Sequence, residues 1–73
     1  MLTIEQNGDA VQVKTTGVAQ GIAFRASKER GNHQAAAKAV VEVREIAKAF
    51  DGTARERAMK LRDALAAAGY EVF

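Results

Sequence analysis

The chain has 73 residues, with 11 lysines and arginines against 9 aspartates and glutamates, which gives a formal net charge of +2. This length predicts a single domain over residues 1–73, and so small an excess of positive charge does not by itself indicate a nucleic-acid partner. With no cysteine and one histidine, the sequence excludes disulfides, thiolate zinc sites and multi-histidine metal sites, so we expect no metal and no cofactor.

The N-terminal residues do not have the pattern of a signal peptide. MLTIEQNGD lacks a basic start followed by an apolar run. No apolar stretch approaches the roughly 20 residues that a membrane-spanning helix needs. We therefore expect a soluble, cytoplasmic protein without a membrane partner.

Two short alternating stretches predict a first β-hairpin. Residues 2–6 and 10–16 each alternate apolar and polar side chains, with period two. Between them, Asn7-Gly8 is the strongest short hairpin signal, because both residues accept the positive φ of a type I′ turn. A loop longer by one residue, through Asp9, is the alternative.

A third strand is predicted over residues 22–27, after a turn over residues 17–21 that two glycines bracket. Ile22, Phe24 and Ala26 would share one face of this strand. An antiparallel meander of three strands then has one apolar face, which needs a cover of helices.

The longest periodic stretch, residues 32–50, predicts an amphipathic helix. Its apolar residues recur at steps of four and three and form one stripe: Ala36, Val40, Val43, Ala47 and Phe50. Asn32 is a good N-cap, and Ser27 is an alternative, earlier start that Gly31 disfavours. Gly52 suits the left-handed position that closes a helix.

A second helix should follow at once, because Thr53 and Glu56 form a capping box. Its stripe has the same spacing: Ala54, Ala58, Leu61, Leu65 and Ala68. Gly69 ends it, and residues 70–73 alternate again, which predicts a fourth strand, with a frayed tail as the alternative.

The predicted fold class is therefore α+β. We expect an antiparallel sheet of three or four strands that carries two helices on one face, in the order β-β-β-α-α-β. The alternative is a bare hairpin with a helical pair, in which the third strand is irregular and the tail is disordered.

No motif in the sequence carries catalytic chemistry. His33 is the only side chain that titrates near neutrality, and it falls beside a helix cap, where a surface role is typical. No serine has the context of a nucleophile, and Gly17 and Gly21 do not form a phosphate-binding pattern. We expect a non-enzymatic protein with no catalytic residue.

Two apolar residues lie on the predicted polar faces of the helices. They are Val41 on the first helix and Met59 on the second, where Arg55 and Arg62 share the edge of Met59. In a domain with a thin core, such residues indicate an interface, with another protein or with a second copy in a homodimer. In size and composition the chain is similar in style to the compact accessory and inhibitor proteins of phages and mobile elements.

The alternative function is nucleic-acid binding. A basic cluster surrounds the predicted third strand and its exit loop: Lys14, Arg25, Lys28 and Arg30. Over residues 10–45 the arrangement is loosely similar to the arm-binding domains of phage integrases, although their aromatic core is missing here. That resemblance implies a sheet face that contacts DNA in the major groove. A solvated sheet face is the simpler interpretation of the same residues.

Overall fold

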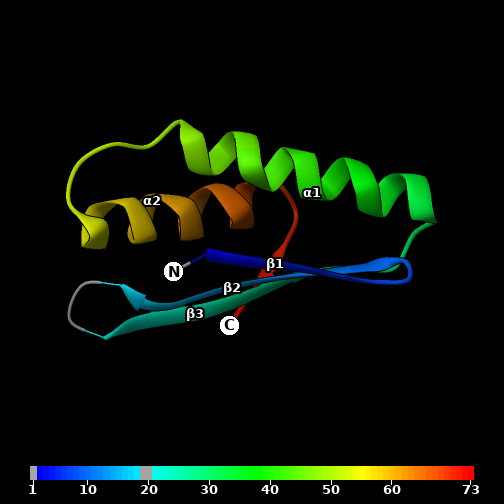
Figure 1. Cartoon of the computed structure of the whole chain (residues 1–73), viewed down its shortest axis with the longest axis horizontal. Coiled ribbons are helices and arrows are strands. Elements are labelled where there is room, and N and C mark those ends of the chain that lie inside the picture. Colours follow the sequence, from blue (N-terminus) through cyan, green and yellow to red (C-terminus); the bar gives the residue numbers. More distant parts are fainter. Residues whose placement is uncertain (1, 19–20) are drawn as a thin grey trace.

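The computed structural model describes residues 2–18 and 21–73. The elements follow in the order β1 (Leu2–Asn7), β2 (Ala10–Val18), β3 (Ile22–Lys28), α1 (His33–Lys48), α2 (Ala54–Ala67) and β4 (Glu71–Val72). The strands form one antiparallel sheet in the order β1-β2-β3-β4. Both helices lie on the same side of this sheet (Figure 1), which confirms the predicted α+β architecture.

The first hairpin turns one residue later than predicted. Pairing between β1 and β2 continues to Asn7 opposite Ala10, so Gly8 and Asp9 form the turn. Gly8 takes a φ of 59°, a conformation that glycine adopts at little cost. Asn7 is a strand residue, and the Asn-Gly signal located the hairpin correctly but not its register.

β2 also runs further than the sequence indicates. It continues through residues 17 and 18, which the sequence pattern assigns to a turn, and its pairing with β3 shifts register between Thr15 and Val18. Gly17 has a φ of 66° at this irregularity, as glycines in β-bulges often do. Residues 19 and 20, at the centre of the predicted second turn, lie outside the described residues.

The core lies between the sheet and the helices. The strands contribute alternate residues from one face, and each helix contributes the stripe that its periodicity predicts. The buried apolar residues are Val11, Val13, Phe24, Ala26, Ala36, Ala39, Val43, Ala58, Leu61, Leu65 and Tyr70. The opposite face of the sheet carries no helix among the described residues, so its side chains face solvent.

α1 begins as predicted and ends slightly early. The side-chain oxygen of Asn32 accepts a hydrogen bond from the backbone N–H of Ala35 at 2.7 Å, which caps the helix. The helix stops at Lys48, so Phe50 lies beyond it, although Phe50 still packs against the core. Gly52, with a φ of 103°, shapes the linker to α2 rather than closing α1.

α2 has the predicted boundaries at both ends. The Thr53 hydroxyl accepts from the backbone N–H of Glu56 at 3.1 Å. At the other end, Gly69 N–H donates to the Ala66 carbonyl and Tyr70 N–H to the Leu65 carbonyl, the pair of bonds that defines a Schellman motif. This turn directs the chain back to the sheet, where β4 pairs with β3 as the predicted fourth strand.

Candidate functional site

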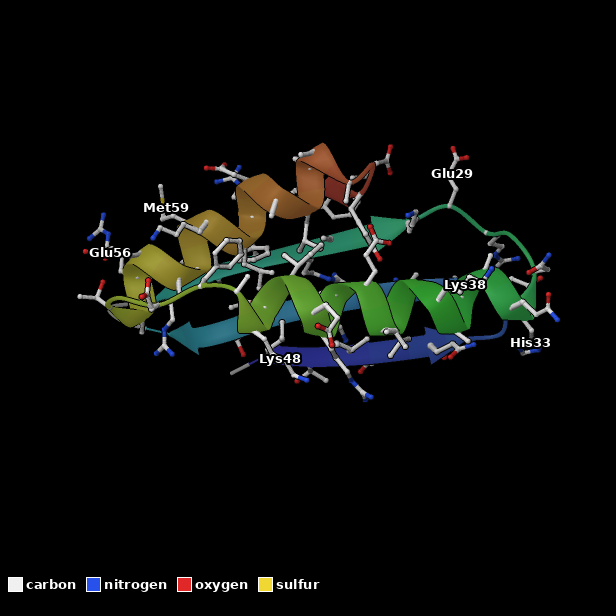
Figure 2. The ribbon with its side chains drawn as sticks, turned by 90° about the horizontal axis from the view of Figure 1, so that it is seen from above. Glu29, His33, Lys38, Lys48, Glu56 and Met59 are labelled. Carbon is white, nitrogen blue, oxygen red and sulfur yellow. The ribbon has the colours of Figure 1, made fainter. Side chains whose placement is uncertain are left out.

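The predicted interface residues divide between two opposite sides of the helical layer. Val41 is 58% exposed and Met59 is 52% exposed, so both lie at the surface as expected. The flank of α2 that faces α1 carries Arg57, which lines a small pocket with Ala47 and Phe50. Met59 lies on the other flank, directed away from α1 (Figure 2), together with the exposed Arg55 and Arg62.

Val41 is on the far side of α1 from α2. The flank of α1 that faces α2 carries Lys38 and Glu42, which line a pocket with Lys28 of β3. Helical periodicity puts Val40, Arg44 and Ala37 on the opposite flank, and Val41 between that flank and the side of α1 that faces away from the sheet. Figure 2 shows Lys48, which shares this flank, on the side of β1. Val41 and Met59 therefore do not form one patch.

Val41 lies beside an open sheet edge. β1 is the first strand in the sheet order, so one row of its backbone N–H and C=O groups points away from β2. On the face of β1 toward the helices, Leu2 is 37% exposed and Ile4 is half-buried. We call this surface the α1–β1 edge and define it by the open side of β1, five apolar residues and the two cations of the same flank of α1: Leu2, Ile4, Ala37, Val40, Val41, Arg44 and Lys48.

The predicted basic cluster is also divided. Lys14 and Arg25 lie opposite each other in the pairing of β2 with β3, on the uncovered face of the sheet. Lys28 is opposite the buried Val11, so its side chain lies on the inner face. Arg30 is exposed in the segment between β3 and α1. The structure brings together only the first pair.

An aromatic residue that the sequence did not single out extends this pair. Phe73 N–H donates to the Arg25 carbonyl at 2.6 Å, and Arg25 N–H donates to the Phe73 carbonyl at 3.3 Å. Lys14, Arg25 and Phe73 thus form a row across the outer face, and Phe73 is 68% exposed. Because the row depends on which strands pair, no local sequence signal could have located it.

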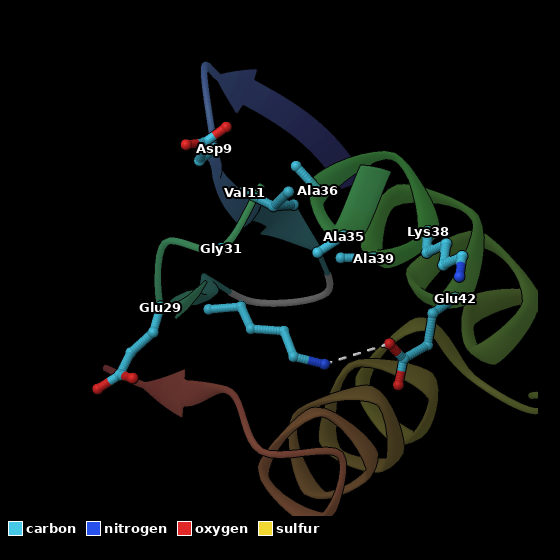
Figure 3. Close-up of a pocket in the computed structure, with 10 residues that line it drawn as sticks. Asp9, Val11, Glu29, Gly31, Ala35, Ala36, Lys38, Ala39 and Glu42 are labelled. Carbon is cyan, nitrogen blue, oxygen red and sulfur yellow. Dashed lines mark hydrogen bonds and ion pairs between the residues drawn. The ribbon is translucent and has the colours of Figure 1, made fainter. Parts of the chain in front are cut away.

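The inner-face position of Lys28 gives it two partners. Its ammonium nitrogen is 3.4 Å from a carboxylate oxygen of Glu42, an ion pair between two residues that line a pocket (Figure 3). The same nitrogen lies 5.0 Å from the centre of the Tyr70 ring, within range of a cation–π contact. Lys28 therefore connects β3 with both α1 and the segment before β4.

Tyr70 is the third member of the cluster with Lys28 and Glu42, and it also contacts α1. Its hydroxyl donates to the Ala39 carbonyl at 3.3 Å. Burial, together with the nearby negative charge of Glu42, raises the pKa of Tyr70 from its ordinary value of 10.0 to about 12. The hydroxyl is thus held neutral as a donor, which suits a structural role.

The pockets are small for ligand binding. The pocket beside Lys28 and Glu42 has a volume of about 220 Å³, and the pocket beside Leu2 and Phe50 about 240 Å³. Ligand sites usually start near ~300 Å³. Within residues 2–18 and 21–73, no group of three or more histidine, cysteine, aspartate or glutamate side chains is placed to hold a metal ion. His33 is exposed at the first position of α1.

Over the same described ranges, no helix is long and apolar enough to cross a membrane. Comparisons with protein-family models, with curated proteins and with solved structures gave no match. The candidate surfaces must therefore be ranked on their own physical chemistry.

Proposed function

We propose that this chain is a small, non-enzymatic protein-binding module, of the accessory or inhibitor kind, and that the α1–β1 edge is its binding surface. The observation that supports this most is the open side of β1 with apolar residues beside it, and Val41, 58% exposed, lies on the adjoining surface of α1. Apolar side chains beside unpaired backbone groups offer a partner both burial and hydrogen bonds. The α2 flank with Met59 is a weaker candidate, because Met59 is its one large apolar residue, whereas Leu2, Ile4 and Val40 accompany Val41.

The test compares two matched substitutions. Val41→Asp and Met59→Asp each introduce a charge at a half-exposed apolar helix position, but on opposite sides of the helical layer. The measurement is the amount of protein retained by the tagged chain, with both cellular proteins and an untagged copy of the chain offered. We expect Val41→Asp to reduce retention at least tenfold and Met59→Asp to leave it near the wild-type level.

Circular dichroism of both variants is the folding control, because solvent-exposed substitutions usually change stability little. Equal retention by wild type and folded Val41→Asp would refute the α1–β1 edge as the binding surface. A loss that is confined to Met59→Asp would transfer the function to the outer flank of α2.

The row of Lys14, Arg25 and Phe73 supports a second candidate function, binding of single-stranded nucleic acid. Exposed aromatic rings stack on bases, and adjacent cations bind phosphates. This function ranks second because two carboxylates share the same face. Glu5 is 3.2 Å from Lys14, and Glu71 is opposite Ser27, the next outer-face residue of β3 after Arg25. The four charges cancel.

Fluorescence anisotropy with labelled single- and double-stranded DNA and with RNA tests this candidate. Binding should weaken steeply with salt, and Arg25→Ala should lower the slope of log affinity against log salt by about 0.7 for a single strand. Phe73→Ala should weaken binding to single strands most. Arg44→Ala, on a helix, is the matched control. If Arg25→Ala and Phe73→Ala bind as wild type does, the sheet face is not a nucleic-acid site, and Arg30 remains to be tested.

A further inference from the structure

We propose that the partner at the α1–β1 edge is a second copy of this chain, joined by antiparallel pairing of the two β1 strands into a continuous eight-stranded sheet. This inference rests on the proposed function and names its partner. Four observations support it: the composition of β1, the position of α1 over the sheet, the location of Val41 along that edge, and the surface area of one chain.

β1 lacks three features that protect exposed edges, and Glu5 is its one charged residue. Monomeric proteins block open strands with lysine, proline or a bulge. β1 has the sequence LTIEQN, without lysine or proline, and its pairing with β2 runs without a register shift from Leu2 to Asn7. An unblocked strand of six residues is a template for another strand, and antiparallel pairing with itself satisfies both copies equally.

We place the two-fold axis of this pairing at Ile4. In a symmetric antiparallel pair, one residue of β1 must lie opposite its own copy. Only then do the helix-facing side chains of both strands lie on the same side of the sheet. An axis at Glu5 would place two carboxylates directly opposite each other, which is unfavourable. An axis at Ile4 instead pairs Ile4 with its own copy and Leu2 with Gln6 of the second chain, all on the face toward the helices.

The position of α1 fits this register. α1 contacts β1 and β2 equally, so its axis runs above the gap between them, half a strand spacing inside the edge. Pairing of two β1 strands then separates the two α1 axes by two strand spacings, about 9.6 Å. Packed helices lie 8–10 Å apart. The same operation that closes the sheet edge therefore brings the two helices into contact.

Val41 is near the middle of that helix contact along α1, at its solvent-side rim. Two contacts show how β1 is aligned along α1. At one end of β1, Leu2 shares a pocket with Ala47 and Phe50. Near the other end, Gly31 N–H donates to the Asp9 carbonyl, just before α1 starts. Ile4 consequently lies beneath the part of α1 near residues 40–44. Val40 then lies toward its copy across the axis, the small Ala37 permits close approach, and Arg44 and Val41 lie at the solvent-side rim of the contact.

The surface area of one chain is also large for a monomer. The described structure exposes 4819 Å² at a mass of 7.8 kDa. The scaling law for compact monomers gives about 4,400 Å² at this mass. The surplus is about 400 Å², about two thirds of the roughly 600 Å² that each chain contributes to a small stable interface.

Sedimentation equilibrium of the full chain measures the mass directly. We expect wild type to have twice the 7.8 kDa monomer mass at micromolar concentration. Val41→Asp should weaken the dimer at least tenfold, and Met59→Asp should leave its dissociation constant within about twofold. A monomeric wild type, or a dimer that Val41→Asp leaves intact, would overturn the inference.

A second measurement keeps the proposal testable if Val41→Asp folds poorly. The chain has no cysteine, so Val41→Cys and Met59→Cys each provide one attachment point for a short bis-maleimide. We expect cross-linked dimers from Val41→Cys and only monomers from Met59→Cys. Equal yields from both variants would contradict the arrangement.

The two proposals fail in distinguishable ways. If wild type is monomeric but still retains a cellular protein in a Val41-dependent manner, the second-copy inference is wrong and the binding function stands. If wild type is monomeric and Val41→Asp retains the same proteins as wild type, both proposals are wrong.

Discussion

Tyr70 connects three parts of this structure: α1, β3 and the segment before β4. It is 4% exposed, its hydroxyl donates a hydrogen bond to the Ala39 carbonyl, and the Lys28 ammonium lies over its ring. It is also the only tyrosine in the chain. A single side chain therefore reports on the contact between α1, β3 and the segment that leads to β4.

The raised pKa of Tyr70 predicts a loss of stability in alkali. The unfolded chain releases the phenolic proton near pH 10, whereas the folded chain keeps it to about pH 12. In that window the folded state binds more protons, so the free energy of unfolding falls as pH rises, and below pH 10 this contribution is intact. Absorbance at 295 nm should show a transition near pH 12, and denaturant unfolding should weaken between pH 10 and 12. Tyr70→Phe should lessen that weakening. A transition near pH 10 in the folded chain would contradict the burial of Tyr70.

Thr15 predicts the opposite kind of effect, a gain of stability on substitution. It is 3% exposed, and its hydroxyl has no hydrogen-bond partner within residues 2–18 and 21–73. Thr15→Val keeps the shape and removes a buried polar group, which should raise the free energy of unfolding by about 1 kcal/mol. Thr3→Val, on the exposed outer face, should change it by less than about 0.5 kcal/mol. Denaturant unfolding measures both, and destabilisation by Thr15→Val would show that the hydroxyl has a partner.

At the scale of elements, the packing of α2 depends on one narrow stripe of buried apolar residues. Leu65 is 0% exposed and is the largest fully buried side chain. Leu65→Ala should lower the free energy of unfolding by about 2–5 kcal/mol, because it leaves a cavity in a thin core. Lys60→Ala, at an exposed position of the same helix, should have little effect. If chemical denaturation gives similar values for the two variants, α2 does not pack as described.

The elements themselves could be predicted from sequence because each has a local signal. The caps at Asn32 and Thr53 and the glycine at position 69 have the expected roles, since side-chain oxygens and left-handed glycines act within a few residues. The errors are of register. The first turn is at Gly8 and Asp9, and β2 continues through Gly17, because strand pairing extends across residues that local turn preferences alone assign to loops.

The candidate sites were less predictable than the elements. Periodicity identified Val41 and Met59 as exposed. It could not show that Met59 lies on the flank of α2 directed away from α1, since this depends on how the two helices pack. Likewise Lys28 belongs to the inner face because the strand extends through it, opposite Val11. Phe73 joins Arg25 only through tertiary pairing.

At the scale of the whole molecule, the two edges of the sheet differ. β4 is a strand of two residues, whereas β1 is a strand of six without lysine, proline or a bulge. The flank of α1 that carries Val40 lies beside the longer edge. Both the proposed binding function and the second-copy inference require that β1 be paired by a partner strand or covered by a partner's surface.

Residue-resolved amide hydrogen exchange on β1 is the measurement that tests this claim most directly. In an isolated chain, the N–H groups of β1 that point away from β2 have no strand partner and exchange rapidly, while those bonded to β2 are protected. We predict that the outward N–H groups are protected at high protein concentration, lose protection on dilution, and lose it at all concentrations in Val41→Asp. Rapid exchange of these N–H groups at every concentration, with β2 fully protected, would show that the edge is open and would contradict the proposed pairing.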